Sequence, residues 1–187
     1  KARCDYKQGR GDLETVERIE SLMNELELST NDRRVVAPAL AKAEKSGEHA
    51  VAIELPDGTV VTGKTGDLLG ASASALLNAL KELAGIDHEL ELVSATSIAP
   101  IQKLKTDYLG SRNPRLHTDE ILIALSASAA DNELAARALE QLPKLNGCDA
   151  HSTVILSSVD DKMFKRLGIQ LTCEPKYEEE ERLYHKS

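Results

Sequence analysis

The loop at residues 110–120 gathers several side chains that can bind or transfer charge. Arg112 and Arg115 flank a proline, and guanidinium groups form bidentate pairs with carboxylates and phosphates. Asn113 lies between them, and Lys64 can reach an anion from the end of an earlier strand. We therefore predict ligand-binding roles for these four residues.

His117 lies in the same loop and is a candidate general acid or base, because imidazole titrates near neutral pH. We predict that Asp119 orients it. If Thr118 caps a helix, the N-terminus of that helix adds a site for an anion. In the alternative interpretation, the arginines pair with Asp119, Glu120 or a neighbouring subunit, and His117 only caps the next element.

Residues 58–65, Gly-Thr-Val-Val-Thr-Gly-Lys-Thr, match the phosphate-loop pattern G-x-x-x-x-G-K-[ST]. That mechanism needs a helix that starts at the lysine, whereas the next helical pattern begins near Gly70. The interior Thr-Val-Val-Thr favours an extended backbone. We predict that the two glycines serve a hairpin turn and a strand exit instead.

A metal site has limited support. Cys148 and His151 have C-x-x-H spacing, and Cys173 and His117 could complete a zinc set. Buried cysteines usually behave as small apolar residues, so we predict no metal and keep Cys148, His151 and Cys173 as the candidates if zinc binds. The zinc deaminase pattern, H-x-E with P-C-x-x-C, is absent from the sequence.

The periodicity of apolar residues predicts the elements that position these side chains. Residues 12–28 and 31–46 read as helices, with Pro38 either near the start of the second or at a kink. A hairpin is predicted over 50–63, and both helix and strand remain open for 121–125. Further helices are predicted over 70–84, 98–109, 131–142 and 160–167, and further strands over 89–93, 152–156 and 169–173.

Helices and strands alternate from about residue 50, which predicts a three-layer α/β sandwich. We place that subdomain at residues 48–187 and a helical appendage at 1–47. The acidic run at 178–181 predicts a solvated or disordered tail.

Composition excludes several classes of protein. The net charge of −8 and the lack of a basic cluster argue against nucleic-acid and membrane-surface binding. Aromatic residues make up 3% of the chain, too few for a base-stacking platform. Three cysteines are too few for a disulfide framework, so we predict a reducing, cytoplasmic location.

Three segments carry a resemblance to a known family. Residues 110–120 (GSRNPRLHTDE), 147–156 (GCDAHSTVIL) and 171–177 (LTCEPKY) resemble the C-terminal part of a bacterial family of longer, uncharacterised proteins with a domain of unknown function. The resemblance implies cytosolic proteins with a further N-terminal α/β portion. It also implies a C-terminal mixed sheet of a topology similar to cytidine deaminases, preceded by helices. It transfers no residue roles, cofactor or activity.

Two functions follow from these observations. The first is a metabolic enzyme domain that binds a phosphorylated or carboxylated small molecule, with His117 and Asp119 as catalytic residues. The second is a structural domain that forms a homo-oligomer or an interface with the N-terminal domain of the same protein, and that has no catalytic residues of its own.

Overall fold

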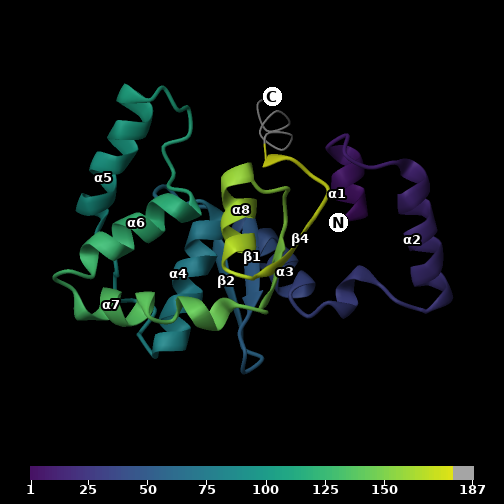
Figure 1. Cartoon of the computed structure of the whole chain (residues 1–187), viewed down its shortest axis with the longest axis horizontal. Helices are drawn as coiled ribbons and strands as arrows, with labels where there is room; N and C mark the ends of the chain where they lie inside the picture. Colours follow the sequence, from purple (N-terminus) through teal and green to yellow (C-terminus); the bar gives the residue numbers. More distant parts are fainter. Residues whose placement is uncertain (179–187) are drawn as a thin grey trace.

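The computed structural model describes residues 1–178, so the predicted acidic tail lies almost entirely outside it. From residue 50 onward, strands and helices alternate less strictly than the periodicity predicts, because residues 65–148 contain helices but no strand (Figure 1). The α-helices are α1 (Ala2–Lys7), α2 (Leu13–Glu25), α3 (Val36–Ser46), α4 (Ala71–Ala84), α5 (Ala95–Lys103), α6 (Thr118–Ser128), α7 (Glu133–Leu139) and α8 (Ser158–Arg166). Shorter helical turns are η1 (Thr30–Asp32), η2 (Leu104–Tyr108, a π-helical turn) and η3 (Leu142–Leu145).

The sheet is mixed, with the strand order β2-β1-β3-β4. Its strands are β1 (Ala50–Glu54), β2 (Val60–Lys64), β3 (Asp149–Ser152) and β4 (Gln170–Cys173). β1 is antiparallel to both of its neighbours, whereas β3 and β4 are parallel. The α/β class is therefore confirmed, while the cytidine-deaminase-like topology stays a prediction.

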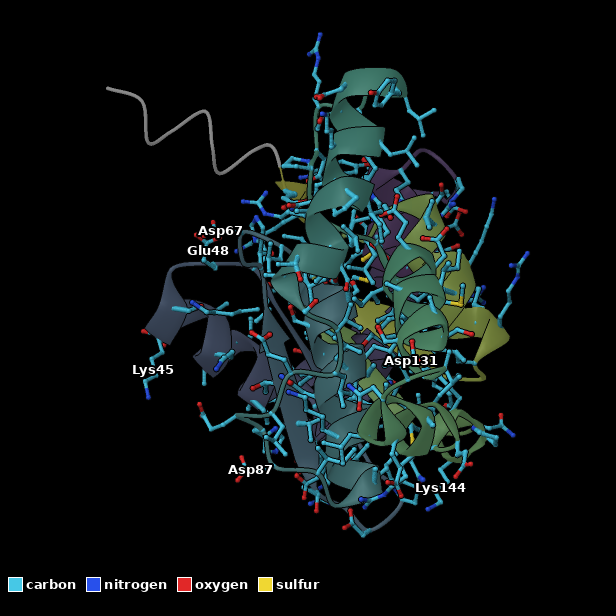
Figure 2. The ribbon with its side chains drawn as sticks, turned by 90° about the vertical axis from the view of Figure 1, so that its left-hand side faces the viewer. Lys45, Glu48, Asp67, Asp87, Asp131 and Lys144 are labelled. Atoms are coloured by element: carbon cyan, nitrogen blue, oxygen red, sulfur yellow. The ribbon has the colours of Figure 1, made fainter. Side chains whose placement is uncertain are left out.

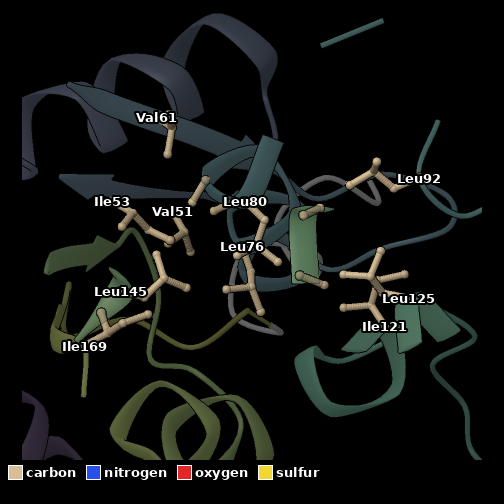
Figure 3. Close-up of a cluster of buried hydrophobic side chains, with 14 of the residues drawn as sticks. Val51, Ile53, Val61, Leu76, Leu80, Leu92, Ile121, Leu125, Leu145 and Ile169 are labelled. Atoms are coloured by element: carbon tan, nitrogen blue, oxygen red, sulfur yellow. The ribbon is translucent and has the colours of Figure 1, made fainter. Parts of the chain in front are cut away.

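Helices cover both faces of the sheet. On one face, α3 packs on the central strands, where Ala39 and Ala52 are fully buried. On the other face, α4 covers β1 and β2, and Leu76 and Leu80 pack with Val51 and Ile53 in the main core (Figure 3). The core is built from aliphatic side chains, as a composition so poor in aromatic residues requires.

The start of α4 lies unusually close to β2. An ideal Cβ on Gly63 would stand 2.1 Å from the backbone nitrogen of Ala75. Ala71, Ala73 and Ala75 are buried at this contact, and small side chains are what allow a helix to approach a strand so closely. The predicted hairpin is thus confirmed and β2 is no phosphate loop, but Gly63 lies inside β2 rather than at its exit.

Two predicted strands are wrong in place or kind. Residues 89–93 alternate between polar and apolar side chains, but they form no strand, because no strand within residues 1–178 pairs with them. Leu92 is buried beside α4 instead. The strand predicted at 152–156 is β3, three residues earlier. The open choice for 121–125 is settled, since these residues lie inside α6.

The predicted appendage contains helices of two kinds. α3, with Pro38 in its first turn, forms one layer against the sheet, whereas α1 and α2 lie at the end of the molecule away from α5 (Figure 1). Val16 is the buried residue of α2, and Leu22 and Leu26 of the same apolar stripe are about half or more exposed. The domain boundary near residue 47 stays a prediction.

Charged side chains project outward from the helices and loops, as Lys45, Asp87 and Lys144 illustrate (Figure 2). Within residues 1–178, helices are too short or too polar to cross a membrane.

Candidate functional site

The predicted loop leads into the N-terminus of α6, where His117 is the N-cap residue. The helix begins at Thr118, one residue earlier than a Thr118 cap would require. Glu120 Oε2 accepts a hydrogen bond of 2.8 Å from the backbone N–H of His117, and so satisfies a donor at the helix end. The backbone of His117 is therefore fixed by its own helix, and its ring is left to contact other elements.

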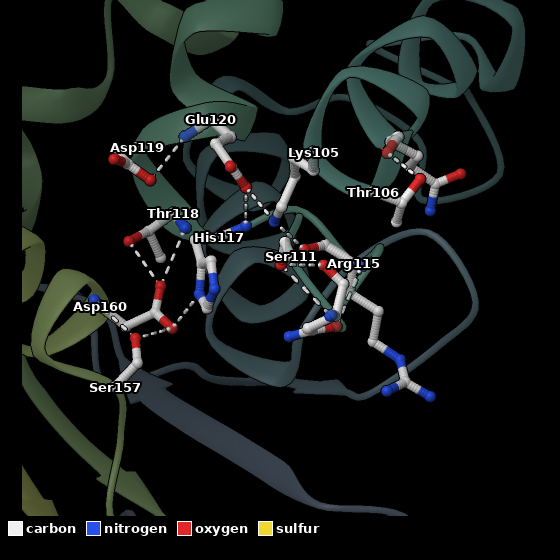
Figure 4. A network of polar contacts seen from close by, with 12 residues as sticks. Lys105, Thr106, Ser111, Arg115, His117, Thr118, Asp119, Glu120, Ser157 and Asp160 are labelled. Atoms are coloured by element: carbon white, nitrogen blue, oxygen red, sulfur yellow. Dashed lines mark hydrogen bonds and ion pairs between the residues drawn. The ribbon is translucent and has the colours of Figure 1, made fainter. Parts of the chain in front are cut away.

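Asp160, in the first turn of α8, holds the ring of His117. The distance between His117 Nδ1 and Asp160 Oδ2 is 3.0 Å (Figure 4). The backbone N–H and the hydroxyl of Thr118 both donate to Asp160 Oδ1, at 2.9 and 2.8 Å. Ser157 donates its hydroxyl to Oδ2 at 3.0 Å. This buried carboxylate thus accepts four hydrogen bonds and joins α8 to the start of α6.

The pair is arranged to carry a proton near neutral pH. The hydrogen bond to Asp160 raises the pKa of His117 above 6.5, and burial opposes this only in part. Burial favours a raised pKa for Asp160, but the hydrogen bonds from His117 and Thr118 outweigh it and hold that pKa below 3.8. An ionised Asp160 fixes the proton of His117 on Nδ1, so Nε2 is left to accept or release a proton.

The raised pKa of His117 makes a testable contribution to stability. Because the folded pKa exceeds the ordinary 6.5, the contribution is fully present below about pH 6.5 and is lost as the pH rises through the folded value. We expect wild type to exceed His117→Gln in free energy of unfolding at pH 5.5, with a smaller excess at pH 8.5. Urea denaturation across this range measures it. An excess that stays constant or grows with pH would contradict the assignment.

A second buried charge stabilises the loop that precedes α6. Lys105 in η2 donates to the backbone oxygen of Arg115 at 2.5 Å and to Glu120 Oε2 at 2.7 Å. Only 7% of the Lys105 side chain is exposed, so this ion pair is far better shielded than a surface pair. Arg115 Nε donates to the backbone oxygen of Gly66 at 2.6 Å, which ties the loop to the turn after β2.

These elements enclose a recess of about 60 Å³, large enough for about four to six water molecules. Its walls come from the turn after β2, the first turn of α4, the 113–117 loop and the segment from β3 to α8. The lining residues used below are Thr65, Ser72, Arg115, His117, Asp160 and Glu178.

The recess brings together some of the predicted residues and separates others. Asn113, Arg115 and His117 line it. Arg112 is exposed and does not line it, and Lys64 lines a different groove along the edge strand β2. Asp119 accepts a hydrogen bond from the backbone of Glu120, and among residues 1–178 the side-chain partner of His117 is Asp160. Asp160, and not Asp119, is therefore the carboxylate in contact with the His117 ring.

The predicted zinc residues are not brought together. Cys148 and His151 are three apart in extended chain, so they lie on opposite faces of the sheet. His151 contacts Thr172 and Glu174 at 2.8 and 3.0 Å, and burial lowers its pKa. Burial raises the pKa of Cys173 to about 12. Within residues 1–178 no three His, Cys, Asp or Glu side chains form a metal-binding group.

Sequence reasoning missed Asp160, Ser157 and Lys105. A signal existed for the first two, because Ser157-x-x-Asp160 has the spacing of a helix capping box. Ser157 is indeed the N-cap of α8. Nothing in the sequence indicates that Asp160 also reaches the start of α6, 42 residues earlier in the chain.

Comparison with known proteins gives this geometry a context. A sequence model described as "Domain of unknown function DUF1846, C-terminal" matches residues 31–184. The chain belongs to this family. A UPF0371 protein of Corynebacterium glutamicum (strain R) is 56% identical over 178 residues, which cover 95% of this chain. A UPF0371 protein of Streptococcus thermophilus (strain ATCC BAA-491 / LMD-9) is 50% identical over 182 residues, or 97% of this chain.

The resemblance to an uncharacterised bacterial family is thus confirmed. The chain spans 36% and 37% of the length of these two relatives, so the DUF1846 C-terminal domain occurs there within longer proteins. Neither the family description nor the relatives' names state an activity.

Proposed function

We propose that this DUF1846 domain belongs to a cytoplasmic enzyme that binds an anionic small molecule in the recess and transfers a proton to or from it through His117. The observation that carries the proposal is the pair of the half-buried His117 with the buried Asp160, at the wall of a recess that Arg115 also lines. A positioned acid or base of this kind contributes about 10²- to 10⁴-fold to a rate.

The roles of the residues follow from their contacts. Arg115 uses Nε to hold Gly66, which leaves the rest of its guanidinium for the ligand. Asn113 Oδ1 accepts from the backbone N–H of Arg115 at 3.1 Å and so positions the loop. Asp160 is a positioning residue that sets the ring and the proton of His117. Arg112, Lys64 and Asp119 play no direct part in this proposal.

The two edges of the sheet support a finer statement on the fold. An antiparallel hairpin at one edge and a parallel pair at the other are compatible with the deaminase-like arrangement, which we propose for the sheet. Deaminase chemistry is not part of the proposal, since its metal-binding pattern is absent from the sequence.

A second role rests on the exposed stripe of α2. Leu22 is 50% exposed and Leu26 67% exposed on an otherwise amphipathic helix. The chain spans only 36% of the length of the Corynebacterium glutamicum relative. This favours a contact of α2 with another part of the longer protein or with a second copy, in addition to any reaction.

The test is a ligand screen on the full-length protein. Phosphorylated and carboxylated metabolites are added singly, and both the melting temperature and the turnover of each compound are measured. We expect one chemical class to stabilise wild type, as a ligand at a hundred times its Kd adds about 2.7 kcal/mol. His117→Gln is expected to keep this stabilisation and to lose turnover by at least about 100-fold.

Arg115→Ala is expected to lose the stabilisation, and the exposed Arg112→Ala is the matched control that keeps it. If no compound stabilises the protein, or if turnover is unchanged in His117→Gln, the enzyme proposal is wrong. The interface role of α2 would then be the better account.

A further inference from the structure

The recess contains two hydroxyl groups that the fold itself does not satisfy. Thr65 is 4% exposed and Ser72 is 3% exposed, and both side chains line the recess. Among residues 1–178, neither side chain makes a hydrogen bond, although a hydroxyl can both donate and accept. Burying a hydroxyl without a hydrogen-bond partner is unfavourable. Two such groups in one recess therefore indicate something that binds between them.

Both residues line the recess, and their hydroxyl oxygens are not sealed inside the core. The sealed side-chain atoms without partners in the described chain are Arg33 Nε and Gln141 Oε1, and the two hydroxyls are not among them. A molecule in the recess can therefore reach Thr65 and Ser72.

The same wall presents the N-terminus of α4, a helix of 14 residues. Its N-cap is Gly70, which offers no side chain to the first turn. The backbone N–H groups of Ala71, Ser72 and Ala73 have no acceptor within residues 1–178. These donors and the positive end of the helix dipole favour an anion at this point.

Positive charge lines the same recess. His117 lines the recess and uses Nδ1 for Asp160, so Nε2 is left for a ligand. Arg115 also lines it. Two carboxylates face the same space. Asp160 is already satisfied by His117, Thr118 and Ser157, whereas Glu178 at the rim opposes an anion.

We infer that the recess binds the phosphate group of a small phosphate monoester, held by Thr65, Ser72 and the first turn of α4 and faced by His117 and Arg115. Four donors belong to residues that line the recess, the backbone N–H groups of Ala71 and Ser72 and the hydroxyls of Thr65 and Ser72, and the N–H of Ala73 follows in the same helical turn. That number suits the three terminal oxygens of a phosphate monoester better than the two of a carboxylate. A space of about 60 Å³ takes a head group of this size, and the remainder of the ligand extends outward.

This inference rests on the proposed function only for the presence of an anionic ligand. It does not need His117 to transfer a proton.

The experiment measures binding of inorganic phosphate and glycerol 3-phosphate to the full-length protein. Calorimetric titration and melting temperature are the readouts, with acetate and chloride at matched ionic strength as controls. We expect both phosphates to bind wild type more tightly than acetate, and the monoester to bind at least as well as phosphate. Thr65→Val and Ser72→Ala should each weaken binding about tenfold or more, as loss of a hydrogen bond to a charged group does.

Ser74→Ala is the matched control, because Ser74 lies on the same helix but lines the groove along β2. It should leave phosphate affinity unchanged, and Glu178→Gln should raise it. Without ligand, Ser72→Ala and Thr65→Val should melt no earlier than wild type, since their hydroxyls have no partners to lose. This second readout shows that a loss of binding is not a loss of folding.

The outcomes separate this inference from the proposed function. Phosphate binding that is unchanged in Thr65→Val and Ser72→Ala overturns the inference and leaves an Arg115 site intact. Stabilisation by carboxylates but not by phosphates would also overturn the inference and leave an Arg115 site intact. Phosphate binding that depends on both hydroxyls, with no turnover of any ester, supports the inference while the catalytic role of His117 fails.

Discussion

Gly63→Ala is expected to destabilise this domain by about 3 kcal/mol or more. The added methyl group would stand 2.1 Å from the backbone nitrogen of Ala75 and 2.6 Å from its Cα. Both atoms belong to the backbone of α4, so no side chain can rotate away, and the helix must leave the sheet. Urea denaturation followed by far-UV circular dichroism measures the loss.

Gly66→Ala is the matched control for this change. It lies three residues further along the chain, just after β2, and a Cβ there has no atom within 4 Å. Its φ angle is also outside the region that favours glycine, so its free energy of unfolding should stay within about 0.5 kcal/mol of wild type. Equal stability of the two variants would show that α4 and β2 are further apart than described here.

Asp160→Asn is expected to cost about 3 kcal/mol of stability and to lower the pKa of His117. The amide is similar in size but carries no charge, and its NH₂ group must face donors that now point at the carboxylate. Once the hydrogen bond to Asp160 is lost, burial and the charge of Lys105 act to lower the pKa of His117 below 6.5. NMR titration of the His117 ring and urea denaturation measure the two effects.

The neighbouring Asp161→Asn provides the comparison for this variant. Asp161 pairs with the exposed Lys165 at 2.6 Å, one turn along α8. An exposed pair of this kind contributes about 0.5 kcal/mol or less, so its loss should have little effect on either measurement. If Asp160→Asn leaves the His117 titration unchanged, then the charge of Asp160 does not set the state of the ring.

Local sequence patterns were sufficient to predict most of the helices and strands. The hairpin over 50–63 follows from two β-rich runs around Pro56-Asp57-Gly58, and Gly58 has the positive φ of +85° that such a turn favours. Helices with one apolar face, such as α2 and α4, could also be predicted from the sequence. The polar–apolar alternation at 89–93 predicted a strand that does not form. A strand also needs a neighbouring strand to pair with, and the sequence does not show which segments pair.

The site was predictable in its location but only partly in its partners. His117, Arg115 and Asn113 lie in one loop, so their proximity is local. Asp160 arrives through the packing of α8 against α6, which depends on the whole core around Phe164. Asp119 was the nearest carboxylate in sequence, but the first turn of a helix directs successive side chains to different sides.

The central position of β1 has a consequence for how the chain is made. β1 lies between β2 and β3, and Ala52 pairs with His151, which is synthesised about one hundred residues later. At the usual rate of elongation this interval lasts about 5–20 s. Once residue 84 has been made, the hairpin and α4 are complete, but one edge of β1 has no strand beside it until β3 is synthesised. Such an edge readily pairs with other chains. The exposure of this protein to misassembly is therefore set by the order of its synthesis as well as by its final stability.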